Sequence, residues 1–253
     1  MTLGRYPSVH RYELKHVLRP DVAKRVARFL RAHLQLDEHC GARDANTYTV
    51  RSIYFDSPHF RCFHEKMAGN RYREKFRIRT YNHSGSSPLF LEHKRKSGLF
   101  YAKEKLLLSS ELLNQIGGRE YDSLASLDRP DRRVVEKLLF HVHRDAYSPV
   151  LLAAYEREAY VDSVDETIRV TLDGNLRAMM FPALRQIHDE TGLEFILHDA
   201  VILEVKFSRV LPRWIGSLRA RFDLQAQACS KYCTSTAHFL GDIPVFKDGM
   251  ACV

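Results

Sequence analysis

The sequence has little cysteine and no long apolar run, and each shortage excludes a class of protein. Its five cysteines are Cys40, Cys62, Cys229, Cys233 and Cys252, an odd number without a C-x-x-C pair. In a chain of 253 residues, which can bury a sizeable core, this favours free thiols in a reducing compartment over a disulfide framework. No stretch approaches the roughly 18 apolar residues of a spanning helix, and the N-terminus has no signal-peptide core. We therefore expect a cytoplasmic protein without a transmembrane segment.

Motifs of the common nucleotide-dependent and hydrolytic enzymes are also missing. The chain contains no G-x-x-x-x-G-K-[ST], G-x-G-x-x-G, H-E-x-x-H or G-x-S-x-G. None of the thirteen histidines has a partner spacing typical of a metal site, and Cys229 and Cys233 lack the further ligands that zinc needs. No repeat, low-complexity tract or long linker divides the sequence. We predict a single domain over residues 1–253.

Positive charge is what the chain has in excess. Lysine and arginine number 39 against 31 aspartates and glutamates, which gives a net charge of +8 and a pI near 9.3. This balance favours a polyanionic partner, which could be nucleic acid, anionic lipid or a phosphate compound. Composition alone leaves these three open.

The charge is most regular between residues 71 and 79, where every second residue is a cation. The cations are Arg71, Arg73, Lys75, Arg77 and Arg79, and Tyr72, Glu74, Phe76 and Ile78 lie between them. Strand side chains alternate between two faces, so this pattern predicts a strand with one cationic and one largely apolar face. A helix would scatter the same cations around its surface. For this strand alone, a solvated charged face is the simple alternative.

Similar patterns predict an α+β protein of short antiparallel strands with helices at a few connections. The expected strands cover residues 11–15, 50–56, 71–81, 89–96, 101–108, 150–161, 167–172 and 195–207, and Asp173-Gly174 is expected to turn the chain. Helices are expected from Pro20, from Ser109 or Ser110 to Gly117, over 131–142, from Pro212 and from Ser230.

Three predicted strands carry an acid two residues before a base, so that both share a face. The pairs are Glu13/Lys15, Glu92/Lys94 and Glu204/Lys206. In an open sheet these charges could be solvated. In a closed barrel one set of charged side chains faces inward, and burying each ion costs on the order of several kcal/mol. A wet basic lumen that receives an anion removes this difficulty, and its carboxylates could hold Mg²⁺ or Mn²⁺ on phosphate.

Nucleic acid is a rival partner on charge alone, because basic and aromatic residues alternate between Arg71 and Arg79. Against it, Tyr72 and Phe76 fall on the face opposite the cations, and the interleaved carboxylates would repel a phosphate backbone. Nucleic acid is therefore not favoured.

Eight short segments, taken in order, resemble the VTC domain family, the polyphosphate polymerase domain of the vacuolar transporter chaperone complex and its bacterial relatives. The segments are Arg11–Lys15, Arg51–Asp56, Arg77–Tyr81, Glu92–Lys94, Tyr155–Arg157, Arg169–Asp173, Leu203–Lys206 and Ser230–Tyr232. Each segment is weak alone, but their order is specific, and the resemblance covers about residues 10–240. That family belongs to the triphosphate tunnel metalloenzymes, with the CYTH phosphatases.

The resemblance implies an eight-stranded antiparallel β-barrel, or tunnel, in which a divalent cation (Mn²⁺ or Mg²⁺) assists transfer of the γ-phosphoryl of ATP onto polyphosphate. The residues that it implies for catalysis are Lys94, Arg77 and Arg79; for phosphate binding Lys15, Lys103, Tyr155, Arg157, Arg169, Lys206 and Lys231; and for the metal Glu204, with Glu13 and Glu92 as further candidates. Two alternatives remain: a hydrolase of tripolyphosphate or nucleoside triphosphate, and a polyphosphate-binding module without turnover. A partner in a membrane is compatible with all three.

Three positions depart from the family pattern. Arg11 stands where CYTH phosphatases have the first glutamate of E-x-E-x-K, which argues against plain CYTH hydrolysis. Ala228 stands where the polymerase has a basic residue three before Lys231, which puts handling of the polymer in question. His93, inside Glu92–Lys94, has no role that the sequence explains.

Overall fold

The computed structural model describes residues 12–40, 46–82, 87–98, 100–118, 124, 127–208 and 210–241. These residues form two compact units. Unit 1 takes the described residues of Arg51–Ala153 and Ala178–Leu193, and unit 2 takes Ala154–Arg177 with the described residues of Val9–Val50 and Glu194–Val253. The prediction of one domain over residues 1–253 stays a prediction.

Eight strands follow one another in hydrogen-bonding order β1-β10-β8-β7-β3-β4-β5-β6, while β2 pairs with β7 and β9 with β8. Their bounds are β1 Tyr12–Leu18, β2 Gln35–Leu36, β3 Tyr48–Asp56, β4 Tyr72–Tyr81, β5 Leu89–Ser97, β6 Phe100–Leu108, β7 Ser148–Val161, β8 Arg169–Met180, β9 Glu194–Leu197 and β10 Val201–Phe207. The pairs β1–β10, β10–β8, β4–β5 and β5–β6 are antiparallel. The α+β class is confirmed, and seven of the eight predicted strands are each found as one strand, while the one expected over 195–207 is divided.

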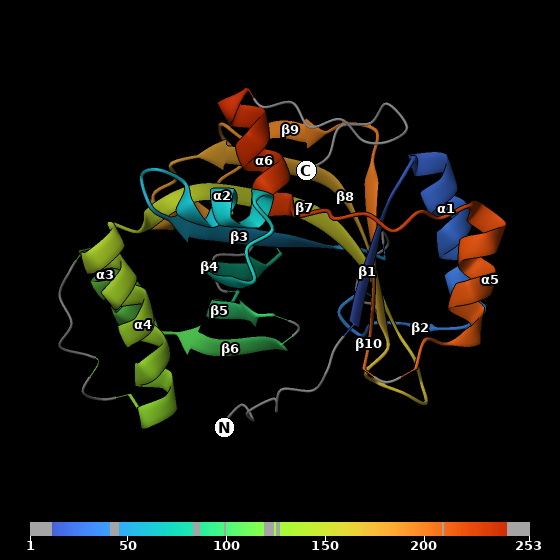
Figure 1. Ribbon diagram of the computed structural model, residues 1–253, viewed down its shortest axis with the longest axis horizontal. Helices are drawn as coiled ribbons and strands as arrows, with labels where there is room; N and C mark the ends of the chain where they lie inside the picture. The colour runs from blue at the N-terminus through green and yellow to red at the C-terminus, as the bar shows by residue number, and fades with distance from the viewer. Residues whose placement is uncertain are drawn as a thin grey trace. The chain divides into compact units, whose positions relative to one another are not determined.

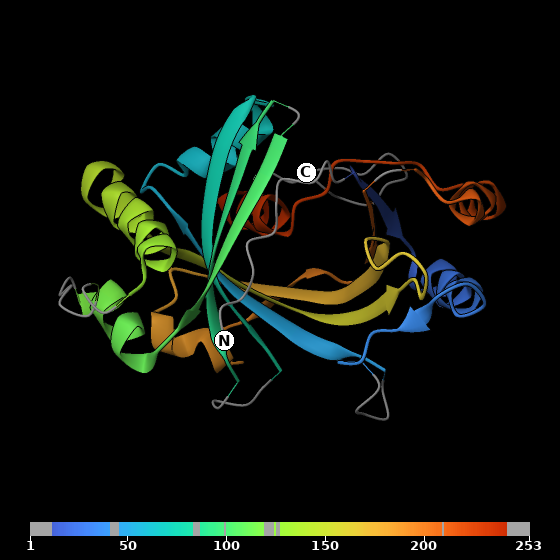
Figure 2. The ribbon, with the colours of Figure 1, turned by 90° about the horizontal axis from the view of Figure 1, so that it is seen from below.

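In unit 1, β4, β5 and β6 lie side by side and α4 lies beside β6 (Figures 1 and 2). The helices of this unit are α2 Arg61–Met67, α3 Ser110–Gly118 and α4 Arg129–Asp145, with a short 3₁₀ helix at Leu184–His188. The α4 helix begins where the Asp128 carboxylate accepts a 2.9 Å hydrogen bond from the Asp131 amide, and Pro130 occupies its first turn. Its buried stripe includes Val135 and Leu138, as the apolar spacing predicts.

In unit 2, α1 (Pro20–Leu30) and α5 (Arg213–Phe222) pack against each other, and α1 also packs on β10 (Figure 1). Both helices cover the apolar face of β1, β10 and β8, where Leu203 and Val205 are fully buried with Leu30 and Ile215. The last helix, α6 (Lys231–Leu240), is capped by the Ser230 side chain. With one face of these strands committed to the core, their charged side chains are forced onto the other.

Two local predictions are wrong. Asp173-Gly174 does not turn the chain, because β8 continues through both residues and the left-handed conformation falls on Asn175, with φ 52°. The single strand expected over 195–207 is two strands, β9 and β10, with residues 198–200 between them. The connection after Pro58 also contains α2, which the sequence pattern did not indicate.

No helix among the described residues is long and apolar enough to cross a membrane. The cytoplasmic location stays a prediction.

Candidate functional site

The strand registers gather the charges of β4, β5 and β6 on one face of unit 1. Arg77 pairs with Glu92 across β4 and β5, and Lys94 pairs with Lys103 across β5 and β6, and directly opposite residues share a face. This cationic face carries eight cations, Arg73, Lys75, Arg77, Arg79, Lys94, Lys96, Lys103 and Lys105, and one carboxylate, Glu92. Such an excess favours an anionic ligand.

Glu92 is the centre of this cationic face, and its side chain is fully buried. Its Oε2 accepts hydrogen bonds from Arg77 Nε at 2.8 Å and Nη2 at 2.5 Å, and its Oε1 accepts one from Lys103 Nζ at 2.7 Å. Burial by itself raises the pKa of Glu92, but the positive charges of Arg77, Arg79 and Lys103 outweigh it and hold that pKa well below its usual range. Glu92 therefore stays ionised and fixes the two bases.

Arg77 and Arg79 of β4 are held against other side chains. In a strand whose charged face is merely solvated, they would extend into water. Arg79 is 6% exposed and donates from Nε to Ser52 Oγ at 3.0 Å, while Arg77 reaches Tyr54 OH at 3.4 Å. Lys94, by contrast, is exposed. Burial, together with the charges of Arg77 and Arg79, lowers the pKa of Lys103 to about 8 against the opposing effect of Glu92. The face therefore has a buried base, with Glu92 and Arg79, and an exposed rim of lysines.

The opposite face of the same strands explains His93. Its buried imidazole stacks on Phe76, with ring centroids 4.2 Å apart and planes 2° apart. Nε2 lies 2.7 Å from Glu74 Oε2 and Nδ1 lies 2.8 Å from Glu104 Oε2. Lys137 of α4 donates to Glu104 as well. The histidine therefore ties β4, β5 and β6 together behind the cationic face, and it does not face the same side as Glu92 and Lys94.

The charged face of unit 2 is nearly balanced. Its cations are Lys15, Arg157, Arg169, Lys206 and Lys231, and its carboxylates are Glu13, Asp37, Asp173 and Glu204. The registers place Glu204 opposite Lys15 on β1 and opposite Thr171 on β8. This face of unit 2 therefore carries nearly as many carboxylates as cations, unlike the cationic face of unit 1.

Glu204 lies between two lysines. Lys15 Nζ is 3.1 Å from Oε1, and Lys206 Nζ donates to Oε2 at 2.6 Å. Lys15 is also 3.2 Å from Glu13 and donates to the Cys229 carbonyl at 3.0 Å. Burial, with the charges of Arg157 and Lys15, lowers the pKa of Lys206 to about 7, although Glu13 opposes this.

Asp173, which was expected at a turn and not among the site residues, organises the other half of this face. Its fully buried carboxylate accepts two hydrogen bonds from Arg157, at 2.7 and 2.8 Å, and lies 2.6 Å from Lys231 Nζ. Burial raises its pKa, but Arg157 and Lys231 outweigh burial and hold the pKa well below its usual range. Lys231 also lies over the ring of Tyr155, 4.6 Å from its centroid.

Arg169 stands at the edge of this group. Its Nη2 is 2.8 Å from Asp37 Oδ2 and 3.5 Å from Tyr48 OH. The register sets it opposite Lys206, so it belongs to the same face although its side chain is turned to Asp37. Asp37 and Tyr48 were not predicted, because both come from a connection and a strand start that carry no charge alternation.

The carboxylates present limit how a divalent cation could bind. Among the described residues, no cluster of three or more His, Cys, Asp or Glu side chains is placed to hold a metal. Glu92 does not fit the role, because both its oxygens are taken by Arg77 and Lys103 in a buried setting. Glu13 and Glu204, which share Lys15, fit a Mg²⁺ or Mn²⁺ ion that takes its remaining ligands from phosphate and water.

The structure thus divides the predicted site residues into two groups. Arg77, Arg79, Glu92, Lys94 and Lys103 lie together in unit 1, and Lys15, Glu13, Tyr155, Arg157, Arg169, Glu204, Lys206 and Lys231 lie together in unit 2. Arg11 lies outside the described residues. Asp173 was missed as a site residue, although its place in the alternation after Arg169 and Thr171 could have indicated it.

Comparison with solved structures shows a protein of the same fold. The chain is similar to HpAC1 from Hippeastrum, which is described as having a dominant triphosphatase activity. The two are 15% identical over 91% of this chain and 96% of that one, with a TM-score of 0.51. It is also similar to the PH1819 protein of Pyrococcus horikoshii OT3, at 16% identity over 90% of this chain and 99% of that one, with a TM-score of 0.45. The likeness to HpAC1 confirms the predicted fold class, an eight-stranded antiparallel sheet with helices at its connections.

Comparison at the level of sequence gives the family. No curated protein sequence matches this chain. The model of the VTC domain matches residues 10–240, which is the range that the eight segments predicted. Since this range covers nearly the whole sequence, the chain belongs to the VTC domain family.

Proposed function

We propose that this protein is a polyphosphate polymerase, which transfers the γ-phosphoryl group of ATP to the end of a polyphosphate chain with a divalent cation. The observation that carries the proposal is the cationic face of unit 1, with eight cations and the single buried carboxylate Glu92. An anion of high charge density would neutralise this face. Family membership supports a phosphate-chain substrate over other anions.

Phosphoryl transfer suits such a face, because it needs positioning and charge neutralisation more than covalent chemistry from the protein. Arg77 and Arg79 are held by Glu92 and Ser52, so they can offset phosphate charge without first being ordered. Because Lys94 is exposed, it is the cation best able to stay in contact with the phosphoryl group as this group moves from donor to acceptor. The residues of unit 2, with Lys15, Arg157, Lys206 and Lys231, would bind further phosphates.

A divalent cation would neutralise phosphate oxygens and lower the repulsion between donor and acceptor when bound. Glu204, with Glu13 beside it, is the residue pair proposed to hold it. Lys15 is within reach of both carboxylates and could shift to a phosphate when the cation takes its place.

The test is incubation of the pure protein with ATP and Mn²⁺, followed by a polyphosphate gel. We expect chains to lengthen with the wild type and not with Lys94→Ala. Lys24→Ala, which removes an exposed lysine of α1, is the matched control and should retain activity. Lengthening at a wild-type rate by Lys94→Ala would refute the assignment.

Hydrolysis is the second candidate, and one position favours it. Ala228 is exposed and has no charge where the polymerase has a basic residue, so a growing chain would lose a contact. Release of inorganic phosphate from tripolyphosphate, without lengthening of chains, would identify a hydrolase. Tight binding of the polymer with neither reaction would identify a binding module.

A further inference from the structure

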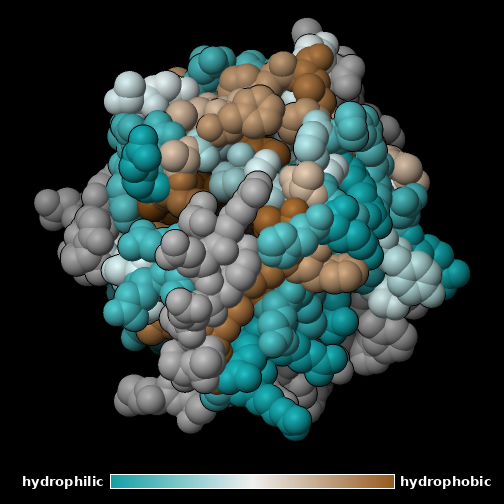
Figure 3. All heavy atoms as spheres, turned by 90° about the vertical axis from the view of Figure 1, so that its left-hand side faces the viewer, coloured by the Kyte–Doolittle hydropathy of each residue, from teal (hydrophilic) through white to brown (hydrophobic). Residues whose placement is uncertain are grey.

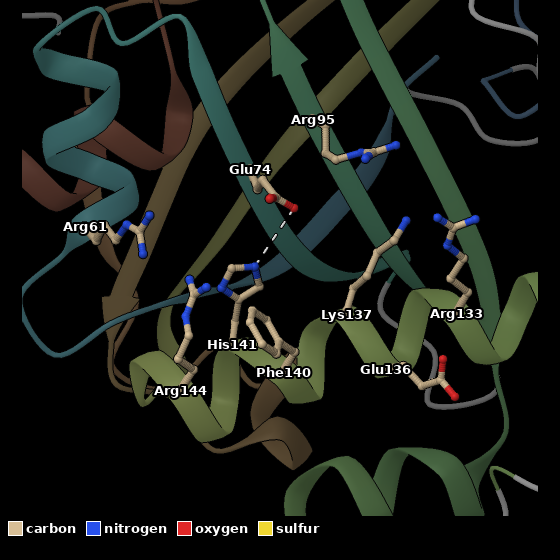
Figure 4. Close-up of a pocket in the computed structure, with 9 residues that line it drawn as sticks. All are labelled: Arg61, Glu74, Arg95, Arg133, Glu136, Lys137, Phe140, His141 and Arg144. Atoms are coloured by element: carbon tan, nitrogen blue, oxygen red, sulfur yellow. Dashed lines mark ion pairs between the residues drawn. The ribbon is translucent and has the colours of Figure 1, made fainter.

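A pocket of about 530 Å³ opens on the face of β4 and β5 opposite the cationic face, between these strands, α2 and α4. Figure 4 shows the nine residues that line it. Seen from the side of the molecule that carries α3 and α4, hydrophilic side chains occupy much of the surface (Figure 3). No step proposed above uses this pocket.

The pocket wall is strongly basic. Its cations are Arg61, Arg95, Arg133, Lys137 and Arg144, against two carboxylates, Glu74 and Glu136. One of these, Glu74, already faces His93 and His141, at 2.7 and 4.0 Å. The wall therefore has an excess of positive charge that its own acids do not neutralise.

At one end of the pocket, Asp145 is a counter-ion common to three basic groups, one of which, Arg61, also pairs with Glu65 at 2.8 Å. Asp145 accepts two hydrogen bonds from Arg144, at 2.9 and 2.6 Å, and lies 2.7 Å from His141 Nδ1 and 3.5 Å from Arg61 Nη1. Arg61 and Arg144 are each about half exposed, so both can turn toward a ligand.

At the other end, Arg95, Arg133 and Lys137 reach into the same part of the pocket (Figure 4). Within the described part of the chain, neither Arg95 nor Arg133 makes an ion pair or a side-chain hydrogen bond, and both are exposed. Lys137 has Glu104 as its partner, but Glu104 also holds His93. Glu74 lies opposite Arg95 across β4 and β5 and interacts with its charge, but no ion pair among the described residues ties up either guanidinium group. Exposed guanidinium groups of this kind are poised for bidentate contacts with phosphate.

We propose that this pocket binds a free oligophosphate, a small anion with at least two phosphate groups. Two groups of basic residues at its two ends, separated by Glu74 and His141, fit a ligand with charge at both ends better than a single phosphate. A hollow of this size also suits a small molecule better than it suits a flat anionic surface. The proposal is independent of the proposed function, because none of these side chains lies on the cationic face.

The test measures binding of tripolyphosphate by calorimetry in a background that weakens the cationic face, Lys94→Ala/Lys103→Ala. We expect this background to retain the pocket site, and any binding by the charged face of unit 2 to be common to all the variants compared. Adding Arg95→Ser/Arg133→Ser should weaken that site by about tenfold or more, because two charge-assisted contacts are lost. Adding Arg129→Ser/Arg185→Ser, which removes two exposed arginines of unit 1 outside the pocket, should leave affinity unchanged.

Equal affinity in the pocket variant and its background would overturn the proposal, as would an equal loss in the control. Vesicles containing phosphatidic acid give a second arm: vesicle binding that needs Arg95 and Arg133, with no binding of tripolyphosphate at the pocket, would also overturn it. Failure of the proposed function is read separately, on the polyphosphate gel, and leaves the calorimetric result intact.

Discussion

Arg157 of β7 and Asp173 of β8 form a buried ion pair with two parallel hydrogen bonds, of 2.7 and 2.8 Å. Lys231, the first residue of α6, reaches the same carboxylate. One carboxylate therefore fixes two of the bases that we propose for phosphate binding. A bidentate pair of this kind fixes orientation as well as charge.

Asp173→Asn should destabilise the protein, because it leaves two buried cations without their anion. We expect a loss of about 3–5 kcal/mol in the free energy of unfolding, measured by urea denaturation. Tripolyphosphate should stabilise this variant more than the wild type, since its charge replaces the lost carboxylate. The exposed Asp199→Asn is the control, and equal stability of the two variants would contradict the prediction.

Glu204→Gln should separate binding from turnover. The amide keeps the shape of a side chain that contacts Lys15 and Lys206 but removes its charge. We expect metal-free binding of tripolyphosphate to tighten and Mn²⁺-dependent turnover to fall by about 100-fold or more. Glu166→Gln, at an exposed position, should change neither quantity. Turnover near the wild-type rate would remove Glu204 from the proposed metal site.

Binding of phosphate should take up protons above neutral pH. The pKa values of Lys103 and Lys206 are about 8 and about 7, so both lose charge below the ordinary lysine value of 10.5. A bound phosphate favours the charged form and raises both values, so each lysine gains a proton at about pH 9. The uptake is measured from the binding heat in buffers of different ionisation enthalpy.

Lys103→Arg provides the comparison for that experiment. Arginine stays charged across this range, so the variant should take up fewer protons than the wild type for the same ligand. Since the ligand's own titration is common to both proteins, the difference isolates Lys103. Equal uptake would show that Lys103 is already charged in the free protein.

His93→Phe should keep the stacking on Phe76 but remove the contacts to Glu74 and Glu104. Because both carboxylates are partly exposed and water can replace the histidine, we expect a cost of about 1–2 kcal/mol in the free energy of unfolding. The exposed His59→Phe should cost little. An unfolding energy equal to that of the wild type would show that the histidine does not hold the strands together.

The same network predicts how stability depends on acid. The hydrogen bond from His93 lowers the pKa of Glu74, and Lys137 and His93 outweigh burial to lower that of Glu104. A carboxyl with a lowered folded pKa stabilises the protein above its unfolded value, near 4.5, and the stabilisation is lost as pH falls further. His93→Phe should therefore show a shallower loss of stability below about pH 4.5, measured by urea denaturation across pH.

Much of the fold was predictable from the sequence, because strand faces are set by an alternation that a reader can follow. The pairs Glu92/Lys94 and Glu204/Lys206 fell on the faces that their spacing required. The break between β9 and β10, by contrast, was missed, although the polar pair His198-Asp199 stands between the two apolar halves.

By itself, the sequence determined the family, the α+β class and the set of cations, because charge alternation with period two is a local property of a strand. Only the tertiary structure decided which charges are paired. Asp173, expected at a turn, anchors Arg157 and Lys231, and His93 contacts Glu74 of β4 and Glu104 of β6. These outcomes depend on the register between strands far apart in the chain, and no local pattern encodes that register.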